Sequence, residues 1–290
     1  MKLRVLPLFM FLIALGLAPL NAEDRVFSGP QAGEKLPEFK VRGVFDAAGK
    51  ELDFVKQAAG KPIVLVFIHD MNRMSLRMTQ VLTHYSAGRA SAGLATGVVW
   101  LGDDVTEAEN NIKRQGHALS REAPTGISVD GKEGPGSYGL NRNVTLTVLV
   151  GKAGQVTANF ALIQPSIAAD LPKILTEIAK VTGEPVATLE DLFILNGTKV
   201  QGPLITLIDR TSKPEDVDRA ATSIEQTLKK DEAGKKEFAR VLLQVEKKGL
   251  LEMHGTPPAH KYLRKWAQEF ASEAQSAAPK TDQKTGAGNQ

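Results

Sequence analysis

The 290-residue chain is 42% hydrophobic and 24% charged, with 36 basic residues, 33 acidic residues and no cysteine. This composition supports one ordinary globular core and leaves enough chain for a second, smaller unit. The charge is close to balance and no aromatic-rich basic patch accompanies it, which disfavours nucleic-acid binding. The lack of cysteine excludes disulfides, thiolate metal ligands, thiol catalysis and a lipid anchor on an N-terminal cysteine.

The first residues have the layout of a secretory signal peptide. Two basic residues precede an uncharged apolar segment from Val5 to Leu20, and acidic residues begin at Glu23. We expect cleavage after Ala22 and export of the protein to the periplasm or out of the cell. The alternative is an uncleaved membrane anchor, because the apolar run approaches the roughly 18 residues that a span requires.

Apolar patterns then predict alternating strands and helices up to Gly183. Thr106 is expected to cap one of these helices, with Glu109 as the acid of a capping box. Two β-branched runs flank the turn at 151–154 and predict a hairpin. The predicted elements in chain order are an edge strand at 39–44, a short helix at 53–59, a strand at 63–68, a helix at 75–85, a strand at 98–101, a helix from 106 to about 116, a short strand at 127–130, hairpin strands at 144–150 and 155–161, and a helix opened at 165.

The segment KPIVLVFIHDMNRMS, residues 61–75, predicts a buried strand followed directly by a helix. Ile63–Ile68 is an apolar, β-branched run of the length expected for a strand covered on both faces. Asp70, Asn72 and Ser75 are residue types that cap helices. Ligands of open α/β sheets collect where strands end and helices begin, because free N–H groups and the helix dipole converge there. We therefore expect a functional site at this edge.

Beyond residue 185 the strand signals fade and amphipathic helices are predicted. They are short helices at 188–195 and 203–208 and longer ones at 214–228, 233–248 and 262–270. Residues 274–290 contain no large apolar side chain and are expected to be disordered. The predicted organisation is a signal peptide at 1–22, an α/β domain at 23–183, a helical C-terminal region at 184–272 and a disordered tail at 273–290.

The order strand, helix, strand, helix, strand hairpin, helix resembles that of thioredoxin-like domains. The segment from Tyr138-Gly139 through Val144-Thr145-Leu146 to Gly154-Gln155-Val156 is similar to the Y-G-x-x-x-x-P-T-x-x-L-x-D-x-x-G-x-I region of the peroxiredoxin and TlpA-type redoxin branches. The resemblance covers about residues 33–182. It implies an α/β fold with a thioredoxin-like central sheet flanked by helices, followed here by a small helical C-terminal region.

The chain departs from this family at the redox centre. Where the family carries C-x-x-C at the start of its first long helix, this chain has Asn72-Arg73-Met74-Ser75, and the position of the family's cis-proline falls at Thr145. Thiol–disulfide oxidoreductase and thiol peroxidase activities are therefore excluded, because the thiolate is the nucleophile in both. What survives is the scaffold, and a fold does not by itself determine a function.

We expect this scaffold to act by binding and to need no cofactor. A protein or peptide partner would lie in a groove at the former redox site, formed by Asn72, Arg73, Met74, Ser75 and Thr145, or against the C-terminal helices. The alternatives are an enzyme that uses the same groove with a metal or carboxylate site, and a structural role within an envelope complex.

The same edge carries two candidate metal sites, of which the first is a site for copper. A soft cuprous ion accepts imidazole and thioether ligands, which His69, Met71 and Met74 would supply. Methionines at this spacing, with Met78 next in the series, more often fill a hydrophobic core.

The second candidate is a carboxylate site. Asp70, Asp103 and Asp104 follow the two predicted central strands and are expected to share this edge. They would suit a hard cation or a metal-dependent enzyme. Calcium needs about six oxygen ligands, however, and the spacing has no calcium-loop signature. Solvated acids that cap turns and helices explain these residues more simply.

Overall fold

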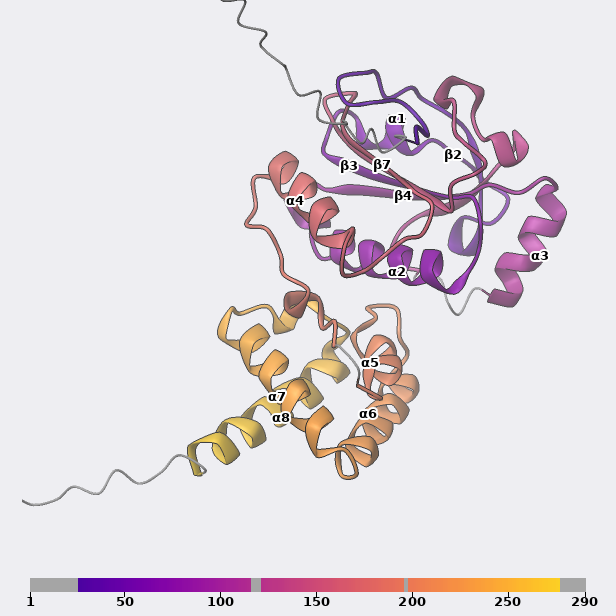
Figure 1. Cartoon of the computed structure of the whole chain (residues 1–290). Coiled ribbons are helices and arrows are strands. Elements are labelled where there is room, and N and C mark those ends of the chain that lie inside the picture. Colours follow the sequence, from indigo (N-terminus) through magenta and orange to yellow (C-terminus); the bar gives the residue numbers. More distant parts are fainter. Residues whose placement is uncertain (1–25, 116–120, 196–197, 277–290) are drawn as a thin grey trace, which may run out of the picture.

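The computed structural model describes residues 26–115, 121–195 and 198–276 (Figure 1). The first unit combines a sheet with flanking helices, and the second is helical. The elements of the first unit are β1 Val41–Gly43, β2 Glu51–Leu52, α1 Phe54–Ala58, β3 Ile63–Ile68, α2 Arg73–Ala87, β4 Ala95–Trp100, α3 Val105–Gln115, β5 Thr125–Ser128, β6 Leu146–Lys152, β7 Gln155–Leu162 and α4 Leu171–Thr182. The later elements are the 3-10 turn η6 Glu190–Leu192, α5 Gln201–Ile208, α6 Pro214–Leu228, α7 Glu232–Lys247, the 3-10 turn η7 Leu251–Met253 and α8 Pro257–Ser276.

Within the described ranges, seven strands form one mixed sheet in the order β2-β1-β5-β4-β3-β6-β7. Strand β3 lies between β4, which runs parallel to it, and β6, which runs antiparallel. All six residues of β3 are buried, as the uninterrupted apolar run from Ile63 to Ile68 predicts. The predicted α/β class, a thioredoxin-like central sheet flanked by helices and followed by a helical C-terminal region, is confirmed.

The alternation of side chains along β3 builds two cores from one strand. Val64, Val66 and Ile68 pack with α2 and α4 on one face of the sheet. Leu65 and Phe67 pack on the other face with α1 and the N-terminal segment. Figure 1 shows α2 and α4 below the sheet and α1 above it. Because both faces are covered, the ends of the strands are the natural place for a site.

Helices α5 to α8 enclose a third core of their own. Phe238 of α7 meets Trp266 of α8 edge to face, with ring centroids 5.6 Å apart. The indole N–H of Trp266 donates a hydrogen bond of 3.0 Å to Glu225 of α6, so the ring is satisfied at its polar end. The amphipathic patterns that predict α6 and α7 therefore reflect a shared interior.

The segment that joins the two units belongs to both cores. Leu192 and Ile194 are buried in the core beneath the sheet, whereas Phe193 and Leu195 are buried in the helical core. The alternating side chains of this segment therefore connect the two cores. Figure 1 shows the helical unit lying beneath α2. The sequence left open whether the C-terminal helices pack on the α/β domain, and the structure shows that they do.

The predicted capping box of α3 is wrong. Asp104 caps this helix, and its carboxylate accepts a 2.7 Å hydrogen bond from the backbone N–H three residues later. Glu109 forms an ion pair with Arg42 instead, at 2.7 Å. The helix begins one residue before Thr106, so that side chain already lies in the first turn.

The predicted end of the helical region is also displaced. Helix α8 spans Pro257–Ser276, far more than the predicted 262–270, and residues 273–276 continue it although a disordered tail was expected from 273. The remaining tail and the expected signal peptide at 1–22 lie outside the described residues. Within the described part of the chain, no helix combines the length and apolar character needed to cross a membrane.

Gly97 in β4 offers a test of the core above the sheet. A Cβ at this position would lie 2.9 Å from Cβ of Phe54 and closer still to its ring, so Gly97→Ala has to displace the ring. We expect a loss of about 1–3 kcal/mol in the free energy of unfolding, measured in urea, as overpacking usually costs. Gly136→Ala is the control, because no described atom lies within 4 Å of its added Cβ. Equal stability of the two variants would contradict this packing.

Candidate functional site

A helix cap occupies the start of α2, where the resemblance places the redox centre. The side-chain oxygen of Asn72 accepts hydrogen bonds from the backbone N–H groups of Met74 at 2.9 Å and Ser75 at 3.1 Å. Ser75 returns the interaction, because its Oγ accepts from the Asn72 N–H at 3.0 Å, and the same hydroxyl contacts the Asp70 carbonyl oxygen at 2.7 Å. This reciprocal arrangement satisfies N–H groups that α2 would otherwise leave unpaired. The side chains of Asn72 and Ser75 are therefore already engaged in capping α2.

Thr145 lies beside the loop that follows β3. Its carbonyl oxygen accepts hydrogen bonds from the backbone N–H groups of His69 at 3.1 Å and Asp70 at 3.2 Å. Its hydroxyl donates to the Ile163 carbonyl at 2.7 Å. The structure thus brings the segment before β6 to the end of β3, as the resemblance implies, but the Thr145 hydroxyl is already engaged.

The methionines of this region do not share one environment. Met78 is fully buried and Met71 packs partly against the core beneath the sheet. Met74 is 43% exposed, and Arg73 beside it is exposed too. The core-filling interpretation therefore holds for Met78 and is wrong for Met74.

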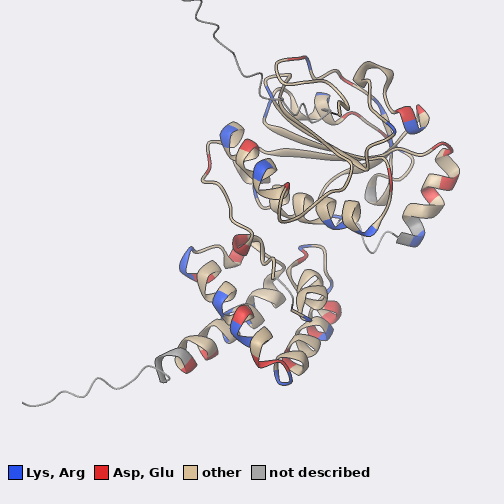
Figure 2. Ribbon diagram, viewed as in Figure 1, with Lys and Arg blue, Asp and Glu red and all other residues tan. Residues whose placement is uncertain are grey.

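A hollow of about 290 Å³ opens at the ends of β3 and β4, and we call it the edge hollow. Its walls come from the residues after β3, those after β4 and the first turns of α3, whose acidic residues are red in Figure 2. Four carboxylates line it, from Asp70, Asp103, Asp104 and Glu107, together with Lys132, His69 and apolar residues. The expectation that the three aspartates share one edge is confirmed.

These carboxylates have different partners. Asp103 forms a 2.8 Å ion pair with Lys132, Asp104 caps α3, and Asp70 accepts a 2.9 Å hydrogen bond from the Asn72 amide. Among the described residues, no group of three His, Cys, Asp or Glu side chains is arranged to hold a metal ion. The edge hollow therefore offers acceptors to a ligand but no preformed cation cage.

His69 sits on the wall of the edge hollow at the end of a buried hydrogen-bond chain. It is 9% exposed, and its Nε2 lies 2.8 Å from the hydroxyl of Thr147, which lies 2.6 Å from the hydroxyl of Ser28. Its Nδ1 has no hydrogen-bond partner among the described residues. Burial lowers the pKa of His69 to about 4, so the ring is neutral at pH 7. Ser28 and Thr147 carry no sequence signal that would have linked them to His69, because the two residues lie 119 positions apart in the chain.

The capping geometry makes a prediction for the first turn of α2. Asn72→Ala removes the cap and should cost about 1 kcal/mol of unfolding free energy. Arg73→Ala changes an exposed side chain and should cost no more than about 0.5 kcal/mol. Urea unfolding of both variants measures the difference, and equal losses would show that Asn72 does not support the helix.

The comparisons with known proteins concern the first unit. No family model and no curated protein matches the chain. Solved structures do align with it, at 12–19% identity. They include an exposed lipoprotein thioredoxin of Streptococcus pneumoniae (19% identity, 49% of this chain, 98% of that one, TM-score 0.38), a peroxidoxin of Mycobacterium tuberculosis (12%, 52%, 97%, 0.38) and a thioredoxin-family thiol:disulfide interchange protein of Chlorobium tepidum (17%, 55%, 100%, 0.36).

These similarities are to other proteins' folds and carry no residue roles over to this chain. The conclusion about the fold rests on the chain's own connectivity: a parallel β3–β4 pair joined through α2, an antiparallel β6–β7 hairpin beside β3, and α4 packed beneath them. The first unit is a thioredoxin-like α/β domain without any cysteine.

Proposed function

We propose that this is an exported thioredoxin-like protein that binds a basic segment of a peptide or protein at the edge hollow and performs no thiol chemistry. The observation that carries the proposal is the hollow itself, which lies at the sheet edge and is lined by four carboxylates against one lysine. The basic, apolar and then acidic order of the N-terminal residues supports export.

Charge favours a cationic occupant. Lys132 offsets only Asp103, so the hollow keeps an excess of negative charge from Asp70, Asp104 and Glu107. Carboxylates at the wall of a recessed site attract ammonium and guanidinium groups, and bidentate pairs with arginine are the strongest of these contacts. A volume of about 290 Å³ has room for one or two side chains. An exposed peptide segment fits this description better than a folded element.

His69 adds an unsatisfied group to the same wall. Its neutral ring is nine-tenths buried, and Nδ1 lacks a partner among the described residues. The Thr147 hydroxyl can rotate to donate to Nε2 or accept from it, so Nδ1 is available as a donor or as an acceptor. Nδ1 is itself buried, so a peptide amide in the hollow would pair with it only once the side chains that cover it move aside.

The exposed pair at the start of α2 widens the surface. Met74 follows Met71, which lines the hollow, by three residues, and its flexible thioether side chain adapts to varied apolar contacts. Arg73 beside it would pair with acidic groups that flank the basic segment. Of the groove residues expected from the sequence, Arg73 and Met74 would contact the ligand. Asn72 and Ser75 would hold the start of the helix in place.

Redox assays test the first half of the proposal. The mature protein, residues 23–290, should not accelerate the reduction of insulin by dithiothreitol, because without a thiolate no mixed disulfide forms. Insulin precipitation followed by turbidity measures this. A rate that rises in proportion to the protein and survives metal chelation would refute it.

Peptide binding tests the second half. The mature protein should bind a fluorescein-labelled (Gly-Arg)₅ peptide more tightly than (Gly-Glu)₅ in fluorescence anisotropy. The double variant Asp103→Asn, Glu107→Gln should weaken the basic peptide about tenfold, which corresponds to about 1.4 kcal/mol. Added salt should also weaken it, since exposed charges are screened.

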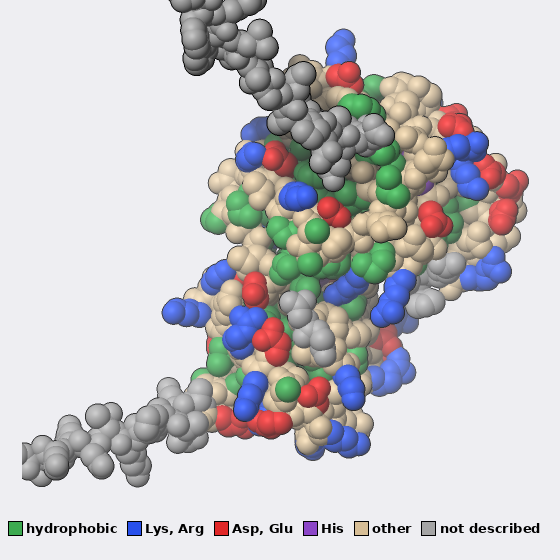
Figure 3. All heavy atoms as spheres, viewed as in Figure 1, with side chains coloured by type: hydrophobic (Ala, Val, Ile, Leu, Met, Phe, Trp, Pro, Cys, Tyr) green, Lys and Arg blue, Asp and Glu red, His purple; other side chains and the backbone are tan. Residues whose placement is uncertain are grey.

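The matched control is Glu38→Gln, which removes one exposed acid outside the lining of the hollow. It should leave the affinity unchanged. If the control, which removes one charge, costs about half the binding free energy that the double variant costs by removing two, net charge explains the effect and the hollow is not the site. Equal affinity for the two peptides would reject a cationic ligand. The face in Figure 3 carries basic and acidic side chains interspersed.

A further inference from the structure

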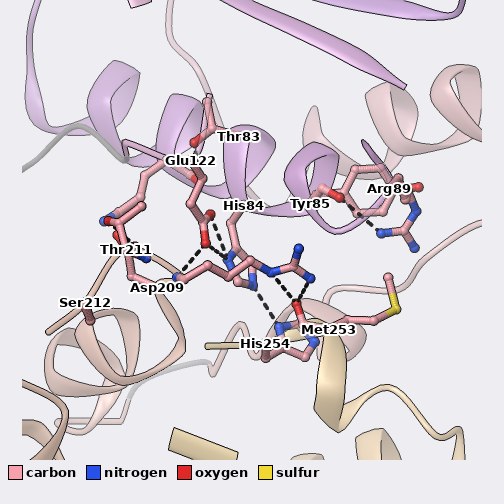
Figure 4. A network of polar contacts seen from close by, with 12 residues as sticks. Thr83, His84, Tyr85, Arg89, Glu122, Asp209, Thr211, Ser212, Met253 and His254 are labelled. Carbon is pink, nitrogen blue, oxygen red and sulfur yellow. Dashed lines mark hydrogen bonds and ion pairs between the residues drawn. The ribbon is translucent and has the colours of Figure 1, made fainter. Parts of the chain in front are cut away.

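Two histidines from different units meet beneath the sheet (Figure 4). His84 belongs to the last turn of α2, and His254 follows the turn η7 of the helical unit. Nε2 of His84 lies 2.8 Å from Nδ1 of His254, and the two rings stack with centroids 5.0 Å apart. Nδ1 of His84 lies 3.0 and 3.2 Å from the carboxylate oxygens of Glu122. The imidazole pair therefore joins the α/β domain to the helical unit.

Arg210 completes the connection from the helical side. Its backbone N–H donates a 2.6 Å hydrogen bond to Glu122, and its guanidinium group donates to the Met253 carbonyl, at 3.0 Å from Nε. Gly88 makes room for this side chain, because a Cβ there would lie 3.1 Å from the Arg210 guanidinium. The polar contacts between the units thus converge on one small, buried area.

The contact limits the protons that the pair can hold. Nε2 of His84 and Nδ1 of His254 face each other at 2.8 Å, so one of these nitrogens donates and the other accepts. Protonation of both rings would place two N–H groups against each other across this distance. The observed contact therefore requires that at least one of the two rings is neutral.

The surroundings oppose protonation of His254. It is 3% exposed, and the edge of its ring packs against Phe193 with centroids 4.8 Å apart. Burial, followed by the charges of His84, Arg210 and Arg89, holds the pKa of His254 well below its usual range. The other charged or titratable groups around the pair are Arg77, Tyr85, Glu122, Glu184, Asp191, Asp209 and Lys248.

Glu122 responds to acid in the same direction. Burial alone would raise its pKa, but the hydrogen bonds from His84 and Arg210 and their charges outweigh burial and lower it. The docked arrangement therefore contains an ionised Glu122, and protonation of this carboxylate weakens its bonds to both partners.

We propose that the His84–His254 contact is a proton-sensitive latch that holds the helical unit on the α/β domain while His254 is neutral and releases it in acid. When the units separate, His254 regains water and takes up a proton near its ordinary pKa of about 6.5. Below that pH, and down to the depressed pKa of the docked state, each unit of acidification favours release up to tenfold. Residues 192–195, which are buried in both cores, remain as the tether.

The absence of cysteine makes this latch directly measurable. Gln57 and Gln268 are exposed, one in each unit, and Gln57→Cys with Gln268→Cys supplies two unique sites for spin labels on the full mature chain. Double electron–electron resonance should give one narrow distance at pH 7.5. A second, longer population should grow as the pH is lowered stepwise to 4.5, while far-UV circular dichroism stays constant.

Two substitutions separate the latch from other acid effects. His254→Asn keeps an acceptor and a donor at this position but does not titrate, so the narrow distance should persist to pH 4.5. His260→Asn is the control, because His260 lies in the same unit and pairs with Glu252 at 3.0 Å; it should respond to pH as the wild type does.

A measurement on the unsubstituted histidines guards against a variant that fails to dock. The ¹⁵N signals of the wild-type His254 ring should show protonation at the pH at which the distance lengthens. The proposal is overturned by a distance that does not change, by lengthening without protonation of His254, by identical responses of wild type and a docked His254→Asn, or by loss of secondary structure at the same pH.

Discussion

The burial of β3 on both faces is the constraint on which the rest of this protein depends. Six consecutive side chains from Ile63 to Ile68 have to be removed from water, and successive residues of a strand point to opposite sides. Both faces of this strand therefore have to be covered. Helices α2 and α4 cover one face, and α1 with the N-terminal segment covers the other. Burying such a run contributes several kcal/mol, at roughly 25 cal/mol per Å² of apolar surface.

That constraint also places the candidate site. A strand covered on both faces can present polar groups only at its ends, and β3 and β4 are parallel, so their ends fall together. The edge hollow is consequently a property of the sheet. The capping box of Asn72 and Ser75 holds the start of α2 beside it.

The junction with the helical unit follows a different rule. Leu192 to Leu195 supply apolar contacts that do not depend on pH, whereas His84, Glu122 and His254 supply buried polar contacts that do. Buried polar groups stabilise an arrangement only while every partner is in place, because an unpaired one keeps its full desolvation cost. The combination of an apolar tether and a conditional polar contact is what allows one unit to shift without leaving the other.

The sequence by itself determined the elements whose signals are local. The apolar run of β3 and the amphipathic periods of α6 and α7 predict the bounds of these elements to within one residue. In each case the pattern of buried side chains lies within one continuous segment of the sequence. The absence of cysteine from the sequence likewise needs no folded structure to be read, and it predicts that the chain performs no thiol chemistry. The cap of α3 was mispredicted because Asp104 and Thr106 are both good capping residues, and only the start of the helix decides between them.

Tertiary structure alone decided the contacts between distant residues. Ser28 and Thr147 lie 119 positions apart in the sequence, and His84 and His254 lie 170 apart. At such separations no periodic pattern links the two residues of a pair. The local sequence around each of these side chains gives no sign of its contact. The packing of the sheet and helices determines which partner each one meets. The sequence placed Asn72 at the end of β3 for a local reason, whereas the carboxylate-lined hollow and the imidazole pair needed the folded chain.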